Sequence, residues 1–171
     1  MTTTATLKLY SLSYTQTKTY LFTAAFIAGN IVLPLICHLV PQGGQTLLPI
    51  YFFTLIGAYK YGWKVGVLTA IFSPLVNHLL FGMPPLTVLP AILSESVLLA
   101  LAAGLAAYHF KRISIPILAL VVLSYQVVGT LLEWAMIGDF SKVIQDLRIG
   151  IPGMLVQIFG GYLFINYLVR K

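Results

Sequence analysis

Six long apolar runs, separated by short segments rich in polar residues, glycine or proline, dominate the chain. Within each run the apolar residues are continuous and do not alternate with polar ones, so the pattern predicts α-helices and not the strands of a β-barrel. Most runs approach the roughly 20 residues that a membrane-crossing helix needs. We expect helices at 18–39, 46–59, 65–80, 86–110, 113–137 and 149–169. The second is short and is expected to be tilted or partly re-entrant.

The connecting segments are brief, which leaves no room for a separate soluble domain. Residues 41–45 are predicted to form a loop, residues 60–64 a turn, and residues 138–148 the most polar connecting loop. Residues 1–17 are polar and rich in threonine, and are expected either to be disordered or to form a short interfacial helix. Residues 1–171 are therefore predicted to form a single six-helix membrane domain.

Composition agrees with an integral membrane protein. Hydrophobic residues make up 59% of the chain, charged residues only 8%, and the mean hydropathy is +0.95. Soluble domains carry roughly 25% charged residues. The net charge of +6 does not indicate a nucleic-acid partner, because the basic residues are scattered at the ends of the predicted helices. The predicted location is the cell (cytoplasmic) membrane, which the chain crosses several times.

The distribution of cations predicts the orientation of the chain, since cytoplasmic loops carry an excess of lysine and arginine. With six helices, the two termini and the second and fourth connections lie on one side of the membrane. That side holds Lys8, Lys18, Lys60, Lys64, Lys111, Arg112, Arg170 and Lys171, whereas the other side holds Lys142 and Arg148. Both termini are therefore expected in the cytoplasm.

Residues 73–95 form the stretch around which a binding site is predicted. Two apolar runs meet there at an uncharged turn, and the polar residues nearby are Asn77, His78 and Glu95. An ionisable residue inside a membrane costs roughly 2.5 to 3.5 kcal/mol by insertion scales, so it usually faces a cavity or a partner. Glu95 is expected either to accept hydrogen bonds from a ligand or to tie helices together. His78 is expected to contact ligand or to be a satisfied structural histidine.

Further polar residues in the last two helices extend the predicted site. Glu133, Trp134, Gln126 and Gln157 are candidate ligand contacts. The alternatives are interfacial solvation for Glu133, an interfacial aromatic anchor for Trp134, and hydrogen bonding between helices for the two glutamines.

No pattern for catalysis, metal binding or phosphate binding is present in the sequence. The chain is therefore predicted to be neither an enzyme nor the holder of a cofactor or metal. Its ionisable groups gather toward the outer side, which suits the capture of a solute. A self-sufficient secondary transporter, and a small membrane enzyme using Glu95, Glu133 or His78, remain alternatives.

Small residues recur four apart in the first predicted helix. Ala24 pairs with Ala28 and Ala25 with Gly29, which makes a flat stripe where another helix can approach closely. The stripe is expected either to dock a partner subunit or to pack within the protein.

These features together resemble the substrate-binding membrane subunit, or S component, of energy-coupling factor (ECF) vitamin transporters. The similarity rests on the size, the six helices, the stripe in the first helix, the sequence GAYKYGWKVG at 57–66, and the hairpin sequence SPLVNHLLFGMPPLTVLPAILSE at 73–95. The hairpin looks like that of the branch with pantothenate and cobalamin S components.

The resemblance implies a role for the chain. An S component binds a vitamin near the outer face, in a pocket built by the outer parts of the fourth to sixth helices and by the first and third connections. Its first helix docks on a membrane coupling subunit, and two cytoplasmic ATPases drive toppling and release. Pantothenate is the first expected ligand, with cobalamin or a precursor, or a queuosine-like base, as alternatives. Glu95 and Glu133 would suit hydroxyl, amide or amine donors.

Overall fold

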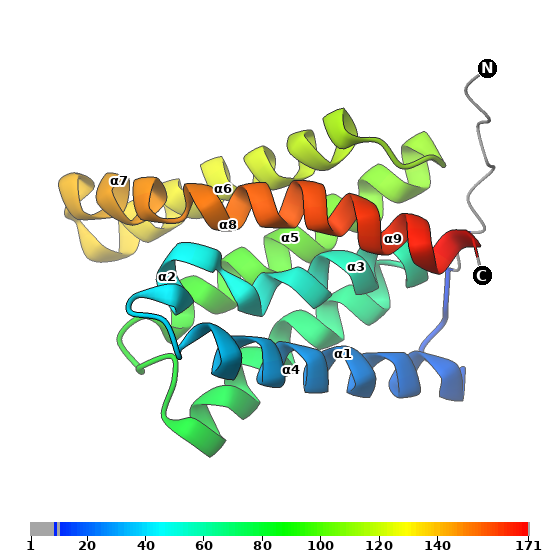
Figure 1. Ribbon diagram of the computed structural model, residues 1–171, viewed down its shortest axis with the longest axis horizontal. Coiled ribbons are helices and arrows are strands. Elements are labelled where there is room, and N and C mark those ends of the chain that lie inside the picture. Colours follow the sequence, from blue (N-terminus) through cyan, green and yellow to red (C-terminus); the bar gives the residue numbers. More distant parts are fainter. Residues whose placement is uncertain (1–8, 10, 171) are drawn as a thin grey trace.

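The computed structural model describes residues 9 and 11–170, and all regular structure in this part of the chain is helical (Figure 1). The elements are α1 (Thr17–Cys37), α2 (Gly43–Leu47), η1 (Pro49–Tyr51), α3 (Phe52–Tyr61), α4 (Trp63–Phe81), α5 (Leu89–Phe110), α6 (Ile115–Ile137), α7 (Phe140–Ile149), α8 (Ile151–Leu155), the π-helical turn η2 (Val156–Gly160) and α9 (Gly161–Arg170).

Five helical segments among the described residues are long and apolar enough to cross a membrane, which confirms a multi-pass membrane character. They are Thr17–Cys37, Trp63–Phe81, Leu89–Phe110, Ile115–Ile137 and Ile151–Val169, the last formed by α8, η2 and α9 in continuity. Each corresponds to one of the predicted runs, because length and unbroken hydrophobicity are what a bilayer requires of a helix.

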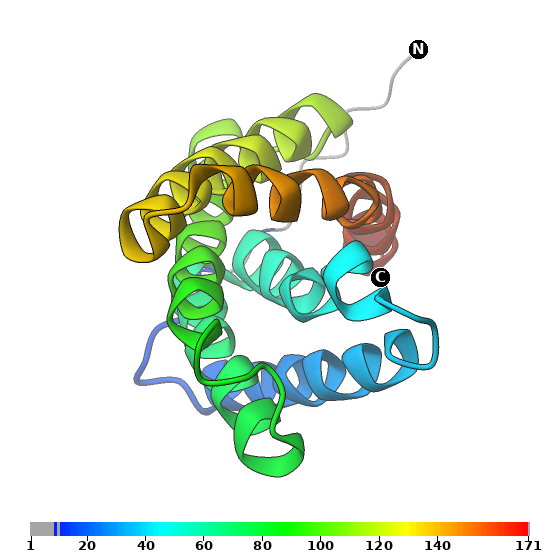
Figure 2. The same cartoon turned by 90° about the vertical axis from the view of Figure 1, so that its left-hand side faces the viewer.

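The central element is α3. It lies inside the ring of the other helices, as the view along the long axis shows (Figure 2), and it contacts α1, α4, α5 and α9. Its residues Leu55, Ile56, Ala58 and Tyr59 are at most 1% exposed. Thr54 and Lys60 of the same helix are also buried, so α3 is enclosed on all sides and is the element on which the bundle packs.

The segment predicted as one helix at 46–59 is instead broken. Residues 43–47 form α2, Leu48 takes the left-handed conformation with φ 48°, and Pro49 begins η1, which leads into α3. Proline has no N–H to continue a helix, and it disfavours the right-handed helical conformation for the residue before it. The prediction of a single helix was therefore wrong, although it placed most of α3 correctly.

The predicted loop at 138–148 was also wrong, because most of it forms the helix α7. The side chain of Asp139 accepts a hydrogen bond from the Lys142 N–H (3.1 Å), which caps the first turn. Val143 is fully buried, whereas Lys142 and Arg148 are exposed. The helix α7 crosses the end of the molecule from α6 to α8 with one side packed against it (Figure 2).

Smaller differences concern the ends of helices and the N-terminal segment. The helix predicted from residue 86 begins at Leu89, and the one predicted from 113 begins after Ser114, whose side chain accepts from the Ile117 N–H (3.4 Å). Of the predicted polar segment 1–17, residues 1–8 and 10 lie outside the described part. Leu12 is buried and donates its N–H to the Tyr61 carbonyl (3.2 Å).

Candidate functional site at the α5–α6–α7 end

Glu95 lies about two turns into α5 and is only 9% exposed. The Tyr51 hydroxyl, from η1, donates a hydrogen bond of 2.7 Å to its Oε2 atom. On the other side Glu95 lies over Gly129 of α6, where a Cβ atom would come within 2.6 Å of the Glu95 Cγ. The absence of a side chain at Gly129 therefore makes room for the carboxyl group between α5 and α6.

A short polar and aromatic chain supports Tyr51. Its ring centroid lies 5.8 Å from that of Tyr125 on α6, and the Tyr125 hydroxyl donates to Gln157 Oε1 (3.0 Å) in η2. Tyr51, Tyr125 and Gln157 are all buried. Four elements, η1, α5, α6 and η2, are thus tied together around Glu95, which holds its carboxyl group in one place.

Glu95 borders a cavity of about 150 Å³ at the end of the molecule where α7 lies. Four elements and their junctions contribute to the wall: the α2–η1 junction, α5 with the residue before it, α6, and α7 with the residue after it. The lining residues are Gln45, Leu48, Val88, Ala91, Ile92, Glu95, Gln126, Thr130, Glu133, Asp146, Leu147, Ile149 and Gly150. Three of the predicted site residues, Glu95, Gln126 and Glu133, are therefore brought together.

The charged residues of the wall are all acidic. Glu95 is buried, Glu133 is half-buried and Asp146 is exposed, so the carboxyl groups run from the interior to the rim. No lysine, arginine or histidine is among the described residues that line the cavity. Its walls offer carboxylate, amide and hydroxyl oxygens, which suit a ligand that donates hydrogen bonds or carries positive charge.

Gln126 is the second buried polar group of the wall. It is 7% exposed, and its Oε1 atom has no hydrogen-bond partner among the described residues. An unpaired buried acceptor costs about 1–3 kcal/mol, and a ligand in the cavity that donates a hydrogen bond would remove that cost.

Asn77 and His78 do not line this cavity. The Asn77 side chain donates to the backbone carbonyls of Asn30 (2.9 Å) and Ser73 (3.0 Å), and so joins α4 to α1. Asn30 in turn donates to Thr54 Oγ1 (3.1 Å) and accepts from the Phe53 N–H (3.2 Å) at the start of α3. His78 Nδ1 lies 2.7 Å from the Pro84 carbonyl within the hairpin. Both side chains are therefore held by backbone carbonyl groups within the fold and do not face this cavity.

Two other predicted contacts, Trp134 and Gln157, also lie off the cavity wall. The Trp134 ring packs edge-on against Phe140 of α7, with centroids 5.3 Å apart, and is 44% exposed. Gln157 is fully buried, accepts from Tyr125, and its Nε2 has no partner among the described residues. Gln157 reaches Glu95 only through the two tyrosines.

The small-residue stripe of α1 divides into two parts. Ala24, Ala25 and Ala28 are exposed, whereas Gly29 faces Phe53 of α3, whose ring would lie 2.7 Å from an added Cβ. Gly29 therefore serves internal packing, and the three alanines remain on the outside of the bundle.

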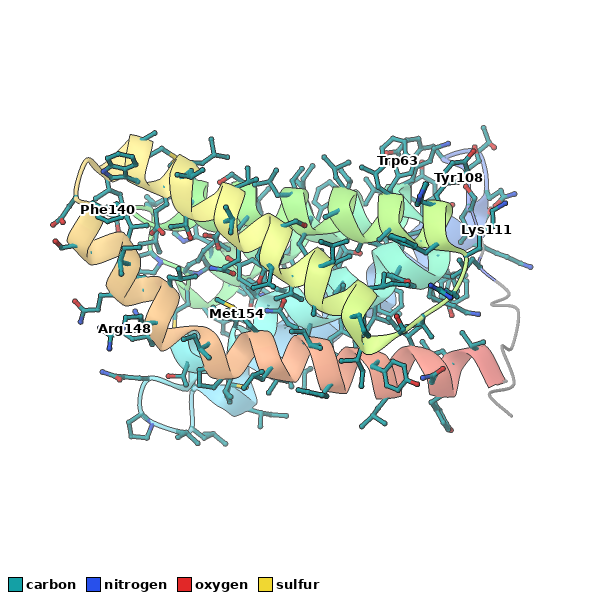
Figure 3. The ribbon with its side chains drawn as sticks, turned by 90° about the horizontal axis from the view of Figure 1, so that it is seen from above. Trp63, Tyr108, Lys111, Phe140, Arg148 and Met154 are labelled. Carbon is teal, nitrogen blue, oxygen red and sulfur yellow. The ribbon has the colours of Figure 1, made fainter. Side chains whose placement is uncertain are left out.

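A larger cavity of about 510 Å³ lies at the opposite end of the molecule, far from the predicted site residues. Trp63, Tyr108 and Lys111, which border it, lie at one end, and Phe140 and Arg148 at the other (Figure 3). Its wall is largely apolar and includes Lys111 but no acidic residue among those described. Among the described residues its wall has neither the carboxyl groups nor the buried, unpaired amide oxygen of the Glu95 cavity.

The residues that sequence reasoning missed are Tyr51, Tyr125, Gln45, Thr130 and Asp146. A tyrosine in an apolar run looks like a core or interfacial aromatic, so nothing marked Tyr51 as the partner of Glu95. Asp146 was expected in a loop, and only the folding of α7 brings it to the rim of the cavity.

Comparisons with known proteins add no relative: no family model matches this chain, and neither a curated protein nor a solved structure matches it.

Proposed function

We propose that this protein is the solute-binding subunit of an ECF-type importer, and that it captures a small water-soluble molecule at the outer face of the cell membrane. The observation that carries the proposal is the cavity around Glu95. It brings together three polar residues that stand alone in apolar runs of the sequence, and it lies at one end of the helical bundle. A buried carboxyl group beside an open cavity suits binding of a solute.

We propose six membrane crossings, with α2, η1 and α3 together making the second. The chain runs back and forth between the same two ends of the molecule (Figure 1), and the end of α9 lies on the same side as the start of α1. Lys18, Lys60, Lys64, Lys111 and Arg112 belong to that side by their place in the chain, against Lys142 and Arg148 at the cavity end. The positive-inside rule then puts both termini in the cytoplasm and the cavity outside.

The proposed partners are a membrane coupling subunit and two cytoplasmic ATPases. The exposed alanines of α1 supply a surface on which a helix of the coupling subunit can approach closely. The driving chemistry is assigned to the ATPases, so this chain need only bind and release its ligand.

Replacing Ala28 by leucine is expected to prevent docking while leaving ligand binding unchanged. Ala28 is exposed on α1, and a bulky side chain there would hold the two helices apart. The measurement is the amount of coupling subunit that co-purifies when the complex is expressed together. Ala135→Leu, at an exposed position of α6, is the matched control. Normal co-purification of the Ala28→Leu variant would remove α1 as the docking surface.

The experiment that tests the function is mass spectrometry of small molecules released from the gently purified protein, followed by calorimetric titration of the molecule found. We expect one solute at near-stoichiometric amount, and expect Glu95→Gln to lower that occupancy. A protein that carries no solute and binds none from a panel of vitamins would contradict the proposal.

A further inference from the structure

Two acceptor oxygens of the cavity wall have no donor among the described residues, and one of them, Gln126 Oε1, is fully buried. Tyr51 donates to Glu95 Oε2, but the described residues give Glu95 Oε1 no hydrogen bond. Gln126 Oε1 on the neighbouring helix α6 is likewise unpaired. Both side chains are more than nine-tenths buried, at 9% exposed for Glu95 and 7% for Gln126, and both line the same cavity. A ligand group with two or more N–H donors would satisfy both oxygens at once.

The charge of the cavity calls for a cationic ligand. Three acidic residues, Glu95, Glu133 and Asp146, line the wall from floor to rim, and no basic residue does so among those described. The nearest cations along the chain, Lys142 and Arg148, are exposed on α7 and do not belong to the wall. A cleft whose charged residues all have the same sign, and whose other walls are apolar, raises the local concentration of ligands of the opposite charge.

The arrangement of these acids suits an organic cation better than a single metal ion. Among the described residues no three histidine, cysteine, aspartate or glutamate side chains lie close enough to hold one metal ion. The three acids of the wall are spread along the cavity, one each on α5, α6 and α7. Such a distribution can steer a charged molecule inward, with one carboxyl group engaging it at the floor.

The size of the cavity limits the group that it can enclose. Its volume is about 150 Å³, and an engineered protein cavity of about that volume holds a benzene molecule. A corrinoid is many times larger. The carboxylate of pantothenate would meet three acidic residues, and no cation is among the described residues of the wall. Of the ligand types that the sequence suggested, one that presents a ring-sized group with an amine fits best.

We infer that the cavity binds a ring-sized organic cation whose ammonium or amidinium group donates hydrogen bonds to Glu95 and Gln126, with Glu133 and Asp146 attracting it from the rim. This inference rests on the proposed solute-binding function and names its class of ligand. It concerns binding alone and involves no chemical step.

Three matched probes test the inference: benzylammonium, benzyl alcohol and benzoate, which share one ring and differ in charge at neutral pH. Each is titrated calorimetrically against the full-length protein in lipid nanodiscs. We expect benzylammonium to bind at least about tenfold more tightly than benzyl alcohol, and benzoate not to bind. In Glu95→Gln, and separately in Glu133→Gln, the preference for the cation should fall severalfold. Asp139→Asn removes an acid outside the cavity and should leave the preference unchanged.

Two outcomes would overturn the inference, in different ways. If benzyl alcohol or benzoate binds as well as benzylammonium, or if Glu95→Gln keeps the full preference, the cavity binds a solute but not by its positive charge. The proposed function then stands and the ligand class does not. If none of the probes binds and the protein also ignores a panel of vitamins, both the ligand class and the solute-binding function fail.

Discussion

Replacing Gly66 by alanine is expected to destabilise the bundle by about 1 to 2 kcal/mol, because an overpacking cost of about 2 to 3 kcal/mol exceeds the gain in helix propensity. Gly66 lies where α4 meets α3 and α5. An added Cβ would fall 2.8 Å from the Ala58 Cα, closer still to the Ala58 Cβ, and 3.2 Å from the Ala100 Cβ. These neighbours cannot rotate away, so the helices themselves must separate. The gain of alanine over glycine in helix propensity, about 1 kcal/mol, offsets only part of this cost.

The measurement is thermal unfolding of the purified protein in detergent, with Gly160→Ala as the matched control. An added Cβ at Gly160 would lie 3.2 Å from the edge of the Phe52 ring, a side chain that can shift. We expect the control to melt close to the parent protein and the Gly66→Ala variant to melt well below it. Equal melting temperatures for the two variants would show that the close approach of α3 and α4 at Gly66 does not limit the packing of the core.

The same contact shows why the membrane-length helices could be predicted and their packing could not. Unbroken hydrophobicity is a property of each run alone, so α4 and α6 appeared in the sequence with ends within a few residues of those observed. Which glycine lies at a helix crossing depends on how the helices rotate and cross. Gly66 and Gly57 look alike in the sequence, yet only Gly66 lies against the backbone of a neighbouring helix.

The incorrect predictions of a single helix at 46–59 and of a loop at 138–148 have local causes that the hydrophobicity pattern does not reveal. At Leu48 the chain turns into the left-handed conformation before Pro49, so an apolar run that looked continuous is interrupted. At Asp139 a capping side chain starts a helix in a segment that was read as a loop because of its polarity. Pro49 marks the first place and Asp139, an N-cap residue, marks the second. Giving the N-cap signal more weight than polarity would have found α7.

The candidate site was predictable to the extent that single polar residues stand out in apolar runs. Glu95, Gln126 and Glu133 were named for that reason, and the fold gathers them on one cavity. Asn77 was named because it is near the hairpin in sequence, but its side chain turns toward Asn30 on α1. The direction in which a side chain leaves a helix relative to its neighbours is set by tertiary packing. Closeness in sequence therefore does not tell whether a residue faces the cavity or a neighbouring helix.

The close approach of Glu95 to Gly129 leads to a prediction about function. Gly129→Ala is expected to weaken binding of the solute recovered from the protein by at least about tenfold, equal to about 1.4 kcal/mol. The added Cβ would lie 2.6 Å from the Glu95 Cγ and 3.1 Å from its Oε1. The Glu95 side chain must therefore change rotamer, which breaks the 2.7 Å hydrogen bond from Tyr51 and moves the carboxyl group.

Calorimetric titration of the Gly129→Ala variant measures this loss, and Asn77→Ala is the control that separates it from a general weakening of the fold. Asn77 joins α4 to α1 and does not line the cavity, so its replacement should lower the melting temperature and leave the dissociation constant unchanged. Gly129→Ala should raise the dissociation constant and leave the melting temperature nearly unchanged. The atoms nearest to the added Cβ all belong to the Glu95 side chain, which can move without separating α5 from α6. If Gly129→Ala kept full affinity, the position of the Glu95 carboxyl group would not matter to the ligand. If Asn77→Ala lost affinity as well, binding would depend on the α1–α4 contact and the site would extend beyond the cavity at α5, α6 and α7.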